Sequence, residues 1–174
     1  MAEDARSELG LAAAAILDPW IYAEALGVAV IDGDALDIPE PHKSQLFEVD
    51  SGSWSGLTVG HGDDTLVVLN SSHPRVRQCS TLMHELSHVR LGHVPASVQM
   101  SETGLLLLSD YSEAQEEEAD WLMGALLLPR AALVSLRSQG LSLEQIAQRF
   151  RVSDELCRWR IRMTGVEAQI RHRR

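Results

Sequence analysis

Two histidines flanking a glutamate, His84, Glu85 and His88, form the part of the sequence best suited to chemistry. Histidines four residues apart lie one turn apart on the same face of an α-helix, so both imidazoles could bind one metal ion. A divalent ion held by two histidines and a carboxylate keeps a position for water and lowers the pKa of that water. Glu85 would accept the proton of the water and pass it to the leaving amine, which is the chemistry of peptide hydrolysis.

The third metal ligand distinguishes the classes of zinc peptidase that share this spacing. One class needs a third histidine six residues after His88, but that position is Val94. A carboxylate from a later helix is the alternative, and Glu116 and Asp120 lie four residues apart on one predicted helix face. We therefore predict Glu116 as the third ligand and Asp120 as the acceptor of a ligand histidine's free ring N–H. The acidic cluster at Glu116 could instead be only the solvated start of a helix.

The metal that this ligand set favours by default is zinc, and other divalent ions are alternatives. The two histidines should lie on a helix that directly follows a strand. A proline after Ser71–Ser72–His73 predicts the start of that helix, and Gly92 predicts its end. The carboxylates should lie on a second helix over residues 112–127, which is acidic in its first turns and is closed by Pro129.

The remaining elements are expected to include a sheet and several short helices. Strand-like runs occupy residues 28–31, 45–49, 54–59 and 65–70, and residues 35–45 are expected to form a loop. For residues 96–110 the pattern does not distinguish a strand from a helix. Helices are expected twice within residues 2–26 and again at 130–138, 142–150 and 154–164. Turn residues between the last two strand-like runs predict a small antiparallel sheet, and hence an α+β fold.

Three stretches of the chain resemble the ImmA/IrrE metallopeptidases. They run from Val67 to Asn70, from Thr81 to His88 and from Glu116 to Pro129, and Leu141 to Ser153 is similar to the helix-turn-helix-like segment that follows the core in that family. The resemblance implies a zincin-like core over residues 1–130 and a helical, helix-turn-helix-like segment over 131–174. It also implies a limited cut in a helix-turn-helix repressor that relieves repression of stress, phage or mobile-element genes.

Composition and charge restrict the setting in which such an enzyme would work. The chain has 174 residues, of which 45% are hydrophobic and 23% charged, a balance typical of a single globular core. No apolar run is long enough for a membrane-spanning helix, and the acidic start does not suit a secretory signal, so we expect a cytoplasmic protein. Cys79 and Cys157 lie far apart and are expected to be free thiols.

The basic C-terminal part supports a second, different hypothesis. Residues 1–136 carry 6 basic and 21 acidic side chains, whereas residues 137–174 carry 9 and 4, so the net charge changes from −15 to +5. Arg158, Arg160 and Arg162 could contact phosphates if residues 154–164 were a recognition helix. The protein would then be a non-cleaving regulator that binds DNA or a repressor. Alternatively, this helix docks on the acidic body and presents Trp159 and Ile161 to the core.

Two further roles remain open on the sequence alone. Tyr111, His93 and His73 are candidates for stabilising the oxyanion. Tyr111 fits best because it lies near the acidic helix, but the sequence does not decide among the three. The strand at 65–70 could hold an extended substrate by edge pairing, provided that it lies at an edge of the sheet.

Overall fold

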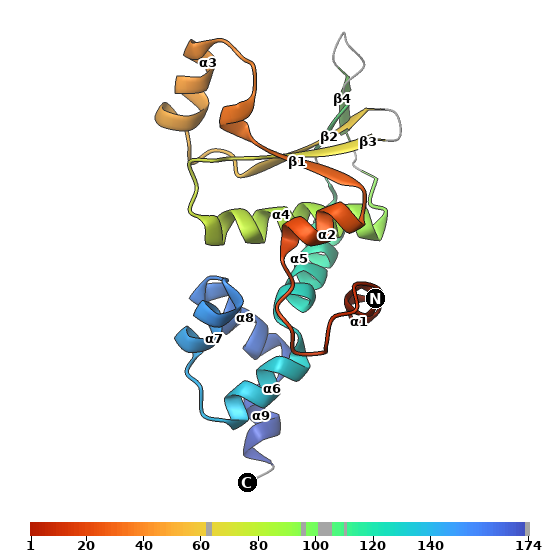
Figure 1. The fold of residues 1–174 in the computed structure, drawn as a ribbon, viewed down its shortest axis with the longest axis vertical. Helices are drawn as coiled ribbons and strands as arrows, with labels where there is room; N and C mark the ends of the chain where they lie inside the picture. The colour runs from red at the N-terminus through yellow and green to blue at the C-terminus, as the bar shows by residue number, and fades with distance from the viewer. Residues whose placement is uncertain (62–63, 95–96, 101–105, 110, 173–174) are drawn as a thin grey trace.

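The computed structural model describes residues 1–61, 64–94, 97–100, 106–109 and 111–172. Its strands are β1 (Val28–Asp32), β2 (Gly56–His61), β3 (Asp64–Leu69), β4 (Ser97–Met100) and β5 (Leu106–Ser109). Its helices are α1 (Ala2–Glu8), α2 (Pro19–Ala25), α3 (Glu40–Ser44), α4 (Arg75–Leu91), α5 (Glu113–Leu127), α6 (Arg130–Ser138), α7 (Leu143–Phe150), α8 (Asp154–Thr164) and α9 (Val166–Arg171). The sheet lies at one end, α4 runs beneath it, and α5 leads from α4 towards the C-terminal helices (Figure 1).

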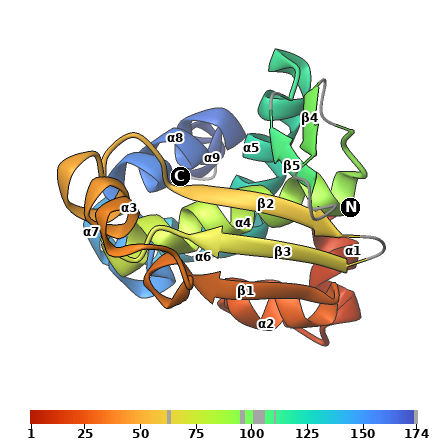
Figure 2. The same cartoon turned by 90° about the horizontal axis from the view of Figure 1, so that it is seen from above.

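The five-stranded sheet has the order β1-β3-β2-β5-β4, which can be followed in Figure 2. β3 pairs antiparallel with β2 but parallel with β1, so the expected α+β class is confirmed while the sheet is mixed and not purely antiparallel. Within residues 96–110, the described segments are the two strands β4 and β5, which pair antiparallel. Because β3 is paired on both sides, it has no free edge at which a substrate could add a strand.

Residues 40–49 differ most from the sequence-based expectation. The predicted strand at 45–49 is wrong, because Gln45–Val49 forms a π-helical turn that continues from α3, itself within the predicted loop. The apolar side chains of this segment pack locally: Phe47 lies edge-on to Trp54 with ring centroids 5.5 Å apart, and the indole N–H of Trp54 donates to the carbonyl of Leu46. Local packing thus replaces strand pairing here.

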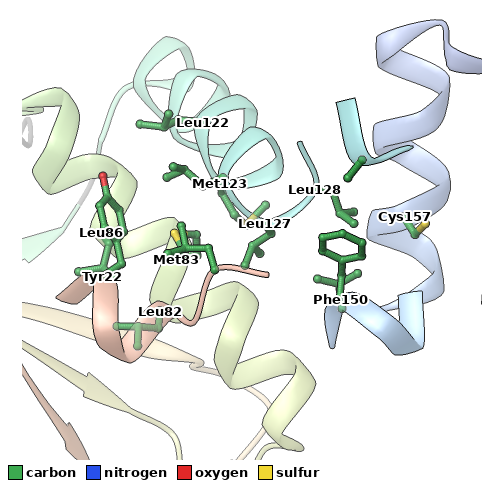
Figure 3. Packing of buried hydrophobic residues seen from close by; sticks show 14 of the residues in the cluster. Tyr22, Leu82, Met83, Leu86, Leu122, Met123, Leu127, Leu128, Phe150 and Cys157 are labelled. Atoms are coloured by element: carbon green, nitrogen blue, oxygen red, sulfur yellow. The ribbon is translucent and has the colours of Figure 1, made fainter. Parts of the chain in front are cut away.

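The helix α4 is positioned by its ends and by its buried face. It begins after Pro74 and ends at Gly92, which adopts the left-handed conformation that glycine favours at a helix C-terminus. Leu82, Met83 and Leu86 are fully buried on the helix face that packs against the sheet and α5, as Figure 3 shows. This packing fixes the rotation of α4, and therefore the direction in which its histidines point.

The C-terminal helices share the same hydrophobic core as the sheet and α4. Phe150 of α7 and Cys157 of α8 are buried beside Leu128, which follows α5 (Figure 3). Cys157 and Cys79 are both free, as expected, and both are buried. The turn between α7 and α8 contains Arg151 in the left-handed conformation. The helix-turn-helix-like nature of residues 131–174 stays a prediction.

Two buried arginines hold the end of α5. Arg6 of α1 donates to the carbonyl of Leu126 at 2.6 Å, and Arg160 of α8 donates to the carbonyl of Leu128 at 3.3 Å. Cationic groups at a helix C-terminus complement its dipole and satisfy carbonyls that lack partners within the helix. Arg160 is 7% exposed, so it faces the core as expected for a docked helix and is not available to bind phosphate.

Glycine at position 124 allows α8 to approach α5 closely. A Cβ atom there would lie 2.6 Å from the Trp159 ring, which also packs on Trp121 with centroids 5.5 Å apart. We expect Gly124→Leu to lower the free energy of unfolding by about 1–3 kcal/mol, as overpacking does. Urea unfolding measures this change.

A leucine at the neighbouring, half-buried Ala125 provides a matched control and should cost less. Adding Trp159→Ala to Gly124→Leu should recover part of the loss. If the two substitutions were additive, the close approach of the two helices would not be the cause.

In the described part of the chain, no single helix is both long and apolar enough to cross a bilayer. The pair α5 and α6, bent by 49°, meets those limits only when taken together.

Candidate metal centre

The side chains of His84, His88 and Glu116 converge between α4 and α5. The two Nε2 atoms lie 3.0 Å apart, and the carboxylate oxygens of Glu116 lie 3.1 Å from Nε2 of His84 and 3.7 Å from Nε2 of His88. One potential ligand atom from each residue lies within 4.8 Å of the others. A tetrahedral ion with bonds of about 2.0–2.1 Å places its ligand atoms about 3.3 Å apart, so these separations suit a single ion.

The proton on His84 can be assigned from its neighbour. Its Nδ1 atom lies 3.0 Å from Oδ1 of Asp120, an acceptor when ionised, so Nδ1 carries the hydrogen and donates it. In the neutral ring, the Nε2 atom then carries a lone pair that points at the cluster.

His88 is held in the same tautomer, with the hydrogen on Nδ1, by a longer chain of hydrogen bonds. The Nε2 atom of His93 lies 3.0 Å from a carboxylate oxygen of Glu118 and must donate to it. In the neutral ring, Nδ1 of His93 is then an acceptor, and it lies 3.0 Å from Nδ1 of His88. His88 therefore donates from Nδ1, and its Nε2 atom is also a lone pair facing the cluster.

Two imidazole lone pairs and one carboxylate thus face a common point. Without a cation they repel one another, whereas a divalent ion would satisfy all three, so the donor set fits a metal ion. Burial lowers the pKa of His88 to about 3, which keeps this ring neutral. Burial alone would also lower the pKa of His84, but the Asp120 hydrogen bond and the carboxylates of Glu85 and Glu116 outweigh burial and raise that pKa. A metal ion would therefore compete with a proton for the Nε2 atom of His84.

Glu85 lies beside the cluster, where Thr58 of β2 contacts it. The Thr58 hydroxyl donates to Oε2 of Glu85 at 2.5 Å, and the side chain of Thr58 is buried. Burial raises the pKa of Glu85, while this hydrogen bond partly opposes the rise. A carboxylate with a raised pKa suits proton transfer near neutral pH. Sequence reasoning missed Thr58, since only the packing of α4 under β2 brings it to Glu85.

The three candidates for oxyanion stabilisation lie in different places. Tyr111 stacks on His88 with ring centroids 3.7 Å apart, and burial raises its pKa to about 12, so its hydroxyl stays protonated at neutral pH. His93 has both ring nitrogens engaged, as described above. His73 lies in another hydrogen-bonded region, where its Nε2 atom is 3.0 Å from the Ser51 carbonyl.

His84 and Glu85 border a cavity of about 310 Å³. The model of a peptidase family, described as the IrrE N-terminal-like domain, matches residues 24–162. The chain belongs to this family. No curated protein and no solved structure matches the chain. The IrrE-like match includes α4, α5 and nearly all of α8, so it contains every residue of the cluster and its neighbours.

His93 offers a test of how the candidate metal ligands are oriented in this member of the IrrE-like family. We expect His93→Phe, which keeps a planar ring but cannot accept a hydrogen bond, to weaken metal binding about 10–100-fold. Competition with a chromophoric chelator measures the affinity. His93→Gln, whose amide oxygen can still accept from His88, should restore part of it. Equal affinities for wild type and His93→Phe would contradict an orienting role for His93.

Proposed function

We propose that the chain is a zinc-dependent endopeptidase in which His84, His88 and Glu116 hold the ion. The observation that carries this proposal is the convergence of two imidazole lone pairs and a carboxylate directly beside Glu85. Membership of a peptidase family supports it. When bound, the ion would polarise the peptide carbonyl and acidify a water molecule.

The other side chains of the cluster have separate tasks in this proposal. Glu85 takes a proton from the attacking water at its carboxylate and gives it to the amine nitrogen as the peptide bond breaks. Thr58 holds that carboxylate in place through the hydrogen bond to Oε2. Asp120 and His93 keep His84 and His88 in the tautomers that leave Nε2 free.

Tyr111 is the proposed donor to the developing oxyanion. Of the three candidates, only Tyr111 and His93 contact a metal-ligand residue, and His93 has no ring nitrogen to spare. The protonated hydroxyl of Tyr111 can donate a hydrogen bond to the tetrahedral oxygen.

The proposed substrate is a helix-turn-helix repressor in the cytoplasm, cut once so that stress, phage or mobile-element genes are released from repression. The resemblance to the ImmA/IrrE metallopeptidases supports this substrate. We further propose that residues 1–130 form the peptidase core and that 131–174 form an attached segment that contributes to substrate recognition.

Incubation with a helix-turn-helix repressor encoded beside this protein tests the proposal. Intact-mass spectrometry should detect two products that sum to the repressor plus one water. A chelator should prevent the cut, and added zinc should restore it. An intact repressor after incubation with protein that holds one zinc ion per chain would argue against this substrate.

A further inference from the structure

A second cavity, of about 330 Å³, adjoins the metal cluster on the side of α8. Ser80 and Met123 border both this cavity and the one at His84 and Glu85, so the two cavities lie side by side. The other walls of the second cavity come from α5 and from the beginning of α8. They are Asp120, Ser153, Glu155, Leu156 and Trp159. We call this second cavity the α8 pocket.

The α8 pocket combines apolar walls with carboxylates. Met123, Leu156 and Trp159 provide apolar surface, and Asp120 and Glu155 provide negative charge. No lysine, arginine or histidine is among the described residues that line it. A side chain with a long apolar stem and a cationic end would match both features, since the stem can lie along the indole ring while the charge meets a carboxylate.

We propose that the α8 pocket is a substrate subsite that accepts a lysine or arginine side chain close to the cleaved bond. This inference rests on the peptidase function proposed above. An extended peptide advances about 3.3 Å per residue, so a pocket that shares walls with the cavity at His84 and Glu85 receives a side chain only a few residues from that bond. The subsite would make α8 a determinant of substrate choice.

Glu155 is the residue best placed to set this preference. It is exposed, and within the described residues no ion pair engages it. Asp154 and Glu155 also offset the partial positive charge at the start of α8, which would otherwise favour an anion. A neighbouring cavity is bordered by Arg158 together with Glu155 and Trp159. An acidic substrate side chain could pair with Arg158 in that cavity, which lies outside the α8 pocket.

Peptide binding to the metal-loaded Glu85→Gln variant tests the subsite without turnover. The probes are blocked pentapeptides with alanine at four positions and arginine, norleucine or glutamate at the centre, which can slide until the central side chain finds its pocket. Proton–nitrogen NMR spectra should show the arginine peptide shifting the Trp159 indole signal and the Ser80 amide. Adding Glu155→Gln should weaken this binding about three- to fivefold, as expected for one exposed charge pair.

Glu144→Gln provides the matched control, because Glu144 is exposed at the second position of α7, as Glu155 is of α8. It should leave arginine-peptide binding unchanged. Equal shifts for the arginine and norleucine peptides, or stronger shifts for glutamate, would overturn the subsite. Repressor cleavage without these shifts would leave the peptidase function standing and remove the subsite. Selective binding of the arginine peptide without any repressor cleavage would leave the subsite standing and argue against the proposed peptidase function.

Discussion

The Glu85→Gln variant is expected to bind zinc as the wild type does and to cleave its substrate about 100- to 10,000-fold more slowly. The amide keeps the shape of the carboxylate and can still accept the Thr58 hydrogen bond, so the fold and the metal ligands should be undisturbed. It has no basic oxygen, however, and cannot take a proton from the attacking water. The rate of the cut under single-turnover conditions, followed by intact mass, measures the loss.

Two measurements make this result interpretable. Native mass spectrometry should find one metal ion per chain in both proteins, and urea unfolding should give similar midpoints. Thr58→Val should slow cleavage by less than Glu85→Gln does, because it removes only the hydrogen bond that positions the carboxylate. Cleavage by Glu85→Gln at the wild-type rate would mean that another group transfers the proton.

The Glu116→Gln variant should lose metal affinity by more than about 100-fold, and cleavage with it. Loss of a group that only orients a metal ligand already lowers metal affinity about 10–100-fold. Glu116 is the single anionic ligand proposed for the site, so its loss should cost more. The rise in unfolding temperature on adding zinc should shrink accordingly, because that rise depends on the affinity of the folded protein for the ion. Chelator competition gives the affinity directly.

Glu117→Gln is the matched control for this substitution. Glu117 is exposed one residue further along α5 and borders a different cavity, beside α1. Its replacement should change the metal affinity less than twofold. A similar loss in both variants would indicate that the general negative charge of α5, and not a bond from Glu116, attracts the ion.

The candidate site was largely predictable because the sequence spacing of its residues determines which helix face they share. A helix repeats every 3.6 residues, so His84 and His88 had to share a face wherever α4 lay in the fold. The same argument placed Glu116 and Asp120 together on α5, and the distances agree with the roles predicted for all four. The mutagenesis above tests those roles.

The supporting contacts could not be predicted, because they depend on how separate elements pack. Thr58 reaches Glu85 only through the placement of β2 over α4, and His93 reaches His88 because the chain turns back after Gly92. His93 was noted in the sequence as a candidate for another task. No periodicity relates these residues in the sequence.

The errors in the fold share one physical cause. Strand propensity in residues 45–49 is a weak preference, and the contacts of Phe47 and Leu46 with Trp54 override it. Likewise, the local pattern of β1 does not reveal whether its partner runs parallel or antiparallel. A helix after Gly165 was not expected either, yet α9 continues from it. Contacts between side chains, and not the preferences of single residues, decided the conformation of residues 45–49.

The arginines that hold the end of α5 come from opposite ends of the described chain. Arg6 lies in the first helix and Arg160 in the eighth, and both donate to carbonyls at the C-terminal end of the helix that carries Glu116. Opening the last turn of α5 therefore breaks a hydrogen bond to each of these helices. We therefore expect α1, α5 and α8 to open together in hydrogen exchange, with the amides near Leu126 among the slowest of these helices to exchange.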